Sequence, residues 1–238
     1  MNDTVIAIPL AQLALGFIPA IITLIIFFRW SQNSGNVLYG LGRMLVQLLL
    51  IGYILTYIFG AQSSAIVLLV LLVMLLFSGW IAMGPVREHR KSLITSSLIA
   101  IAVGGGLTLF VVTQGVLQLD PWFKPNYMVP LAGMAFANAM TAVSLSAERL
   151  YAELAHGKSW IEARHTAFQA ATIPVVNSLF AVGIVSLPGM MTGQILSGVP
   201  PSIAVRYQIM IMCMIFASAG ISTAIFLVLC GRVRQREI

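Results

Sequence analysis

The chain has 238 residues, of which 59% are hydrophobic and only 8% are charged, and its formal net charge is +6. A soluble domain carries about 25% charged residues because it needs a hydrated surface, so this composition excludes an ordinary soluble fold. The apolar residues stand in long unbroken runs, which is typical of helices that face lipid. The sequence therefore predicts an all-α, polytopic protein of the lipid bilayer, with a single transmembrane domain over residues 1–238.

Seven segments are long and apolar enough to cross a hydrocarbon core of about 30 Å, which takes about 20 helical residues. They are Val5–Phe28, Val37–Phe59, Ala65–Met83, Leu93–Leu117, Met128–Leu145, Thr172–Leu187 and Tyr207–Gly231. The sixth segment is the shortest, and the sequence Pro188–Gln194 that follows it predicts a broken helix. Irregular backbone is tolerated at membrane depth only where protein or a watery cavity covers it.

Basic residues orient this predicted bundle. If the N-terminus lies outside, all lysines and arginines except Lys124 and Arg206 fall on the inner side. Short loops rich in Lys and Arg stay in the cytoplasm, so the pattern predicts an N-out, C-in topology. The same distribution accounts for the positive net charge, and we expect no nucleic-acid partner.

The longest hydrophilic stretch, residues 148–171, predicts a helical hairpin on the cytoplasmic side. Gly157 stands where a helix would stop in a left-handed cap. Ser159 then opens a Ser-x-x-Glu capping box that ends at Glu162 and starts a second helix. The stretch is too short to be an independent domain, so we interpret it as a helix, a tight break and another helix.

The charges and the aromatic residue of this hairpin predict a docking surface. Arg149 with Glu153, and Lys158 with Glu162, are opposite charges four residues apart, which supports helix formation. We expect Trp160 to be exposed. A small knob with mixed charge and an exposed aromatic ring suits a groove on a soluble partner, although a solvated connection between two spans fits the same residues.

One match to a nucleotide-binding motif is incomplete. Gly157-Lys158-Ser159 resembles the end of a phosphate-binding loop, but Ala152 occupies the position where that motif needs its first glycine. The spans also contain no nucleophile–base pair or metal-ligand spacing. We therefore expect no catalytic residue in this chain, no enzymatic activity and no cofactor of its own.

Neutral polar residues are the candidates for a translocation path. Ion-driven carriers usually place Asp, Glu or His within their spans, but here those residues lie at termini, in loops or at span ends. The candidate path residues are Asn138, Asn177, Ser178, Pro188, Gly189, Met190, Met191, Gln194, Arg206 and Gln208. Hydrogen bonding between helices is the alternative explanation for the polar ones, and the sequence identifies no metal ligand.

Several segments resemble the FetB-type permeases of ATP-binding-cassette transporters. The most specific is Ser186-Leu187-Pro188-Gly189-Met190-Met191, within a longer similar region from Val182 to Ile195. The other similar segments are Thr172–Ser178, Arg206–Met210, Pro130–Met140 and, more loosely, Gly42-Arg43 with Gln47. The resemblance extends over most of the chain.

This resemblance implies a homodimeric permease of the bacterial inner membrane that works with a separate cytoplasmic ATPase subunit, which would hold ATP and Mg²⁺. Bacterial members are linked to iron export, and plant relatives to aluminium tolerance. It also implies that the hairpin is the coupling region. The residues expected to dock the ATPase are Glu153, Gly157, Lys158, Ser159, Trp160, Glu162 and Ala163.

Two other functions fit the same sequence. A stand-alone secondary carrier would transport its solute without an ATPase. A membrane receptor or assembly protein would use the cytoplasmic hairpin to bind a partner and would transport nothing.

Overall fold

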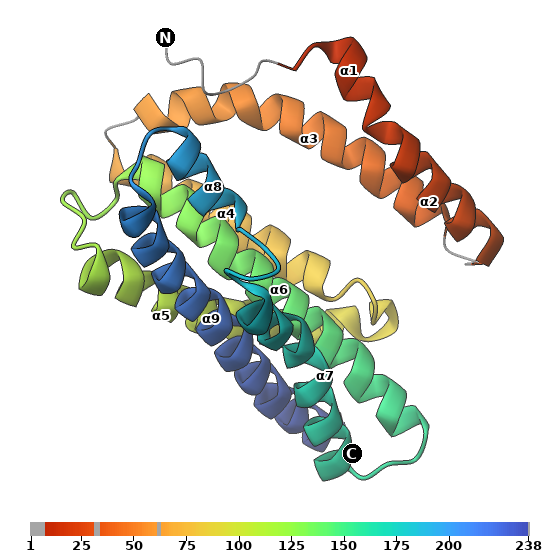
Figure 1. The fold of residues 1–238 in the computed structure, drawn as a ribbon. Coiled ribbons are helices and arrows are strands. Elements are labelled where there is room, and N and C mark those ends of the chain that lie inside the picture. Colours follow the sequence, from red (N-terminus) through yellow and green to blue (C-terminus); the bar gives the residue numbers. More distant parts are fainter. Residues whose placement is uncertain (1–7, 31–33, 61–62, 238) are drawn as a thin grey trace. The chain divides into compact units, whose positions relative to one another are not determined.

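A computed structural model describes residues 8–30, 34–60 and 63–237 of the chain. Its regular structure over these ranges is helical, apart from one isolated bridge between Val182 and Ser186 (Figure 1). The all-α prediction is therefore confirmed. The chain divides into two compact units, Met1–Ala61 and Gln62–Ile238.

In its described residues, 8–30 and 34–60, the first unit contains three helices: α1 (Leu10–Leu15), α2 (Phe17–Trp30) and α3 (Ser34–Gly60). Helices α2 and α3 contact each other. No residue of α2 is buried, although nearly all its side chains are apolar. A helix that is apolar on every side and has no buried residue suits a lipid environment. The first residues of the expected span from Val5 lie outside the described residues.

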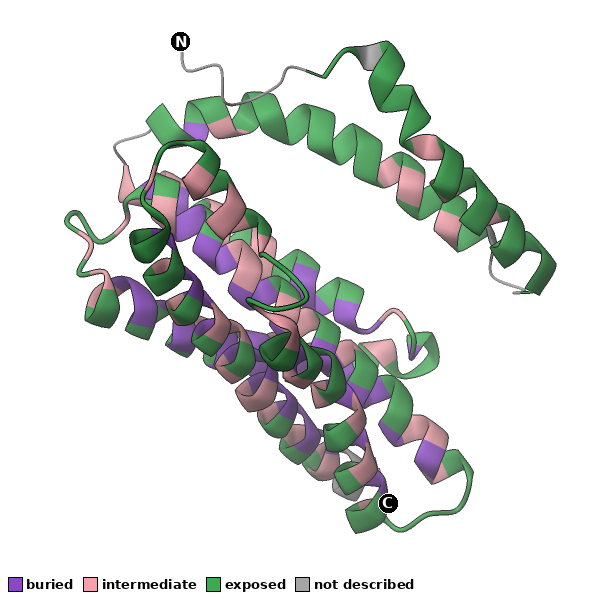
Figure 2. Cartoon of the chain, in the orientation of Figure 1, coloured by how far each residue is buried: buried purple, intermediate pink, exposed green. Residues whose placement is uncertain are grey.

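The second unit holds the remaining elements. They are α4 (Ser64–Ala82), the 3₁₀ turn η1 (Arg87–His89), α5 (Arg90–Phe110), the π-helical η2 (Val111–Val116), α6 (Pro125–Ala155), α7 (Trp160–Ala181), α8 (Gly189–Leu196) and α9 (Pro201–Glu237). Helices α5, α6 and α9 pack on one another, α4 adds to α5 and α6, and α7 adds to α6 and α9. Figure 2 shows the buried residues concentrated along these helices.

Small residues bring α5 close to its neighbours. A Cβ atom added to Gly104 would lie 2.6 Å from the backbone nitrogen of Ser222 on α9, and one added to Gly105 would lie 2.8 Å from Cδ1 of Phe136 on α6. Ser97 Oγ also donates a hydrogen bond to the carbonyl oxygen of Gly79, 3.3 Å away on α4. Gly104 and Gly105 therefore let α9 and α6 approach α5 closely.

Within the described residues, six helical segments are long and apolar enough to cross a membrane, and they match six of the seven expected spans. The expected sixth span, Thr172–Leu187, has no counterpart among them. Helix α7 starts in the polar hairpin and ends at Ala181, short of the expected Leu187. Only Thr172–Ala181 of the expected span is therefore helical in α7, and polar residues of the hairpin make up the earlier part of that helix.

The two ends of the second unit differ in charge. At one end the ring of His89 stacks on that of Tyr151, with 4.2 Å between centroids. Figure 1 shows the α6–α7 connection and the end of α9 at this end of the unit. This end carries Arg87, Arg90, Lys91, Arg149, Lys158, Arg164 and Arg232. The opposite end, where α6 and α9 begin, carries Lys124 and Arg206. The basic residues therefore gather where the hairpin lies.

Candidate functional site

The connection between α6 and α7, residues 154–163, forms a sharp turn that we call the elbow. Helix α6 ends at Ala155, and Gly157 has a left-handed backbone with φ +79°. Ser159 then caps α7: its Oγ accepts the backbone N–H of Glu162 at 3.4 Å, and its own N–H donates to Glu162 Oε2 at 3.1 Å. The predicted helix stop and capping box are both confirmed.

A buried carboxylate ties the two sides of the elbow together. Glu153, only 5% exposed, is paired with Arg149 at 2.5 Å and with Lys158 at 2.6 Å. The expected pair of Lys158 with Glu162 is wrong. Lys158 lies in the turn and not in a helix, so the spacing of four residues no longer places it beside Glu162. Lys158 reaches back to α6 instead and fixes the turn to the helix before it.

The capping hydrogen bonds also hold Glu162 in its ionised form. Ser159 Oγ donates to Glu162 Oε2 at 2.7 Å, in addition to the bond from the Ser159 backbone. Both bonds favour the charged carboxylate and hold the pKa of Glu162 below its ordinary value. The start of α7 therefore carries a negative charge, which the helix dipole also favours.

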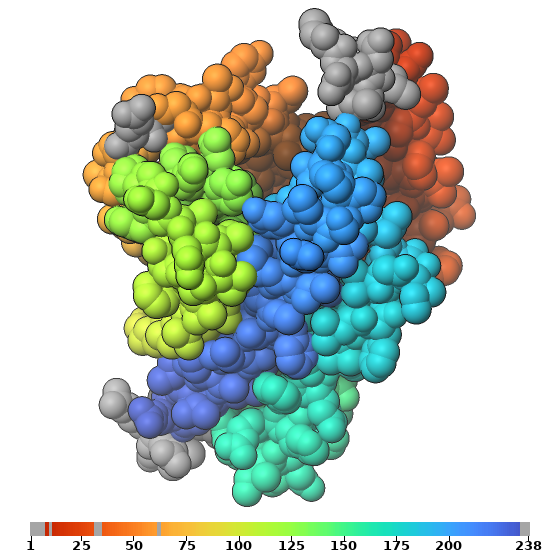
Figure 3. Space-filling view, turned by 60° about the vertical axis from the view of Figure 1, so that its left-hand side comes forward, coloured from red at the N-terminus to blue at the C-terminus, as the bar shows by residue number. Residues whose placement is uncertain are grey.

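The exposed apolar residue of the elbow is Ile161, not Trp160. Trp160 is half-buried and packs against the core, since a Cβ atom on Gly231 of α9 would lie 3.0 Å from its Cζ2. Ile161 is 70% exposed. The expectation of an exposed tryptophan is wrong because α7 turns that ring toward α9. Figure 3 shows the elbow region projecting at the lower end of the second unit, next to the end of α9.

Of the seven residues predicted to dock a partner, some are therefore accessible and others are not. Ala163 and Glu153 are buried and belong to the framework of the elbow. The exposed ones are Gly157, Lys158, Ser159 and Glu162. Sequence reasoning missed Ile161, although its position directly after Trp160 on a helix places it on a different face.

A second joint follows α7 at residues 182–188, which we call the break. Gly183 has a left-handed backbone with φ +84°, and the carbonyl oxygen of Ala181 accepts the N–H groups of Val185 at 2.8 Å and Ser186 at 3.1 Å. The prediction that Pro188–Gln194 is broken is wrong, since Gly189–Leu196 forms α8. Pro188, with φ −63° and ψ 144°, stands immediately before that helix and starts it.

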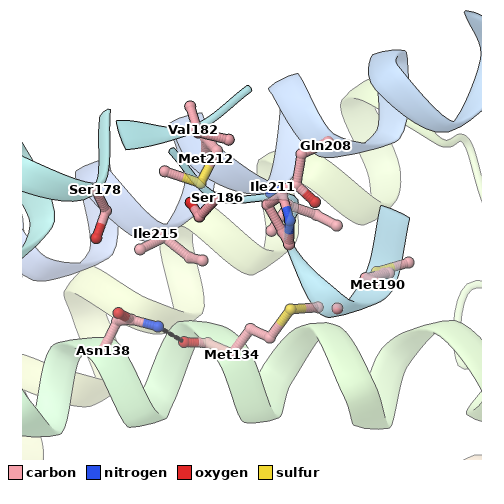
Figure 4. A pocket seen from close by; sticks show the side chains of 12 residues that line it. Met134, Asn138, Ser178, Val182, Ser186, Met190, Gln208, Ile211, Met212 and Ile215 are labelled. Carbon is pink, nitrogen blue, oxygen red and sulfur yellow. Dashed lines mark hydrogen bonds between the residues drawn. The ribbon is translucent and has the colours of Figure 1, made fainter. Parts of the chain in front are cut away.

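The break borders a cavity of about 290 Å³ between α6, α7, α8 and α9. Figure 4 shows Asn138 and Met134 projecting from α6, and Gln208, Ile211, Met212 and Ile215 projecting from α9. The remaining lining residues are Ser178, Val182, Ser186, Pro188, Gly189 and Met190. All twelve side chains are uncharged. The cavity is thus a neutral space with apolar walls and a few polar groups.

The polar groups of the cavity differ in how they are satisfied. Asn138 Nδ2 donates to the carbonyl oxygen of Met134 at 2.8 Å, and Ser178 Oγ donates to that of Pro174 at 2.9 Å. Gln208 is only 6% exposed, and its Oε1 has no hydrogen-bond partner. Buried polar atoms are nearly always paired, so Gln208 marks a place where the cavity offers an acceptor.

The structure brings together six of the ten predicted path residues around this cavity: Asn138, Ser178, Pro188, Gly189, Met190 and Gln208. Asn177 and Arg206 are exposed, and neither they nor Met191 and Gln194 line it. Sequence reasoning missed its other lining residues, among them Met212. In the part of the chain that the structure describes, no three His, Cys, Asp or Glu side chains could together hold a metal ion.

Comparison with known proteins gives consistent relatives over most of the chain. It is 36% identical over 205 residues to the "Probable iron export permease protein FetB" of Escherichia coli, which covers 80% of this chain and 78% of the relative. It is 33% identical over 226 residues to the "UPF0014 membrane protein slr1647" of Synechocystis, covering 88% and 86%. It is 31% identical over 228 residues to the "Protein ALUMINUM SENSITIVE 3" of Arabidopsis thaliana, covering 88% and 82%.

No solved structure matches the chain significantly. The family model described as "Uncharacterised protein family (UPF0014)" matches residues 10–234, nearly the whole sequence. Together with the relatives, this agrees with the resemblance to FetB-type permeases and with the apolar helices. The chain is therefore a multi-pass membrane protein that belongs to the UPF0014 family.

Proposed function

We propose that this chain is the permease subunit of an ATP-driven transporter that exports iron across the bacterial inner membrane, powered by a separate cytoplasmic ATPase. The observation that carries the proposal is the elbow. It is stiffened by a capping box and by the Arg149–Glu153–Lys158 ion pairs, and it presents Ile161 outward. An exposed apolar residue on a rigid, charged turn is what a groove on a soluble partner can grip.

The charge distribution supports an orientation for this proposal. Lysines and arginines gather at the end of the second unit that carries the elbow, which is the side retained in the cytoplasm under the positive-inside rule. Helix α7, the break and α8 together carry the chain from that end to the opposite one (Figure 1). They serve as one interrupted crossing, which gives seven crossings with the N-terminus outside.

The break supports a homodimer. Ile184 and Val185 are 89% and 81% exposed although their backbone is not helical. Irregular backbone at membrane depth needs a cover of protein or water, and these apolar side chains do not suit water. A second copy of the chain covers the segment in our proposal. A V185C variant in a background without Cys213 and Cys230 should give a dimer joined by a disulfide, and a purely monomeric product would argue against this cover.

We base the proposed identity of the cargo on the names of the relatives and not on the geometry of the cavity. The Escherichia coli relative is named for iron export, and we assign the same cargo and direction to this chain. The neutral cavity beside the break is the place where the cargo would bind. Movement of α7, driven from the elbow, would open that cavity alternately toward each side.

The decisive test is recovery of an ATPase with the tagged chain from mild detergent. Wild type should bring down a nucleotide-binding subunit, whereas a variant with Gly157–Ala163 replaced by a Gly/Ser linker should not. An F168A variant is the matched control, because Phe168 is an exposed apolar residue of α7 beyond the elbow. Absence of an ATPase from the wild-type sample would favour a carrier or a receptor. Flux in vesicles that requires ATP then separates the permease from the receptor.

A further inference from the structure

We propose that the cavity takes its cargo as an uncharged species that donates an N–H or O–H group to Gln208, so that a metal crosses as a neutral chelate and not as a bare cation. This inference rests on the proposed transport of a metal. It concerns the chemical form of that cargo, which no relative's name specifies.

Gln208 places an unpaired hydrogen-bond acceptor at the cavity. Its side chain is 6% exposed, it projects from α9 into the cavity (Figure 4), and its Oε1 has no partner within the protein. An amide oxygen accepts hydrogen bonds and cannot donate them. A buried acceptor without a partner is unfavourable unless a donor from a ligand or a water reaches it. The cargo that suits this position therefore carries a donor.

The walls of the cavity carry no charge. All twelve lining side chains are uncharged, so no carboxylate or imidazole compensates a cation that enters. Iron ions bind well to imidazole and carboxylate groups, whereas thioethers prefer softer metals such as Cu(I). Moving an isolated charge into such a space costs far more than moving a neutral molecule of the same size. A bare iron cation is thus the form of the metal that this cavity suits least.

The apolar part of the lining is rich in methionine. Met134, Met190 and Met212 come from three different helices, and unbranched thioether side chains adapt to irregular shapes. With about 290 Å³, the cavity stands near the lower end of the range for sites that bind small molecules. A compact chelate with an apolar rim and a few donors fits these walls.

The test uses gallium(III) tris(acetohydroxamate), a neutral and redox-inert complex whose ligands each keep an N–H group. Its affinity for the purified full-length chain is measured by calorimetry in detergent, without any ATPase, and is compared with that of Fe²⁺ under anaerobic conditions and of free acetohydroxamic acid. The variants are Q208L and Q208E. Q194L is the matched control, because Gln194 also has a buried Oε1 without a partner but does not line the cavity.

We expect the neutral complex to bind wild type and Q194L equally, and Q208L about threefold to tenfold more weakly, as for the loss of one hydrogen bond. Q208E should bind Fe²⁺ more tightly than wild type does, because it adds a carboxylate that the walls lack. Tighter binding of Fe²⁺ than of the neutral complex by wild type, no binding of the neutral complex, or equal affinities of Q208L and wild type would each overturn the proposal. Equal binding of free acetohydroxamic acid would overturn the chelate as cargo. All these outcomes are independent of the ATPase recovery at the elbow.

Discussion

Helix α7 lies between two joints, the elbow and the break. Each contains a glycine with a left-handed backbone, but the residues around the two glycines differ. At the elbow, Gly157 is flanked by a capping box and by a buried carboxylate with two cationic partners. At the break, Gly183 is followed by exposed apolar residues and by a cavity that contains an unpaired acceptor. In the proposed transport cycle, the elbow would therefore transmit movement as a stiff connection, whereas the break would absorb it.

The strongest test of this difference is a G157V variant. No atom lies within 4 Å of a Cβ at this position, so the cost is conformational and not steric. A β-branched residue in the left-handed region costs about 1–2 kcal/mol, which reduces the population of the elbow about fivefold to thirtyfold. We expect ATP-driven flux to fall about tenfold. G157N is the control, since Asn tolerates this conformation, and equal loss in both variants would contradict the assignment.

Separate alanine variants of Ile161 and Trp160 distinguish the docking residue of the elbow from the packing residue. I161A should weaken binding of the ATPase about tenfold, about 1.4 kcal/mol, because an exposed anchor is removed. W160A should leave that affinity nearly unchanged but lower the free energy of unfolding by about 2 kcal/mol, because the ring packs against Gly231. Calorimetric binding and denaturant titration measure the two effects. The reverse pattern would restore Trp160 as the docking residue.

At the break, G183A should slow transport a few-fold without changing ATPase affinity. Its Cβ meets no atom, so the change adds only about 1 kcal/mol of backbone strain to one conformation of the joint. G193A in α8 is the control, because that glycine is helical and also has open space. Equal transport rates in both variants would mean that the break does not flex during the cycle.

The smallest expected effect concerns pH. Hydrogen bonds from Ser159 lower the pKa of Glu162 in the folded protein. Their contribution to stability is complete above the ordinary glutamate pKa of about 4.3 and is lost as the pH falls through the lower folded value. Unfolding of wild type between pH 3 and 6 should therefore show a slightly steeper loss of stability than that of E162Q. If the stability of wild type and of E162Q fell in parallel with pH, the Glu162 carboxylate would not contribute to stability through these hydrogen bonds.

The elbow could be predicted from the sequence because its signals are local. A glycine stop and a Ser-x-x-Glu box act within a few residues, so Gly157, Ser159 and Glu162 were identified correctly. The partner of Lys158 was missed because the turn changes the helical spacing on which the prediction relied. The exposure of Trp160 was missed because it depends on α9, more than sixty residues further along the chain.

The cavity could be predicted only in part. Neutral polar residues within apolar spans, such as Asn138 and Gln208, are conspicuous in sequence. The apolar lining residues Ile211 and Ile215 are not, because they resemble any other apolar residue of a span. The sequence predicted broken helix at Pro188–Gln194, whereas the break lies earlier in the chain, at residues 182–188. A proline followed by glycine indicates a turn, but Pro188 also has the dihedral angles that precede a helix.

The contact of Gly104 with Ser222 leaves no room for a side chain between α5 and α9. Two backbones held this closely cannot slide or rotate past each other at this point without a collision, so α5 and α9 would stay fixed relative to each other in the proposed transport cycle. Helix α7, which contacts α9 and has a joint at each end, would be the part that moves. A substitution intended to trap one state of that cycle would therefore belong on α7 and not on α5 or α9.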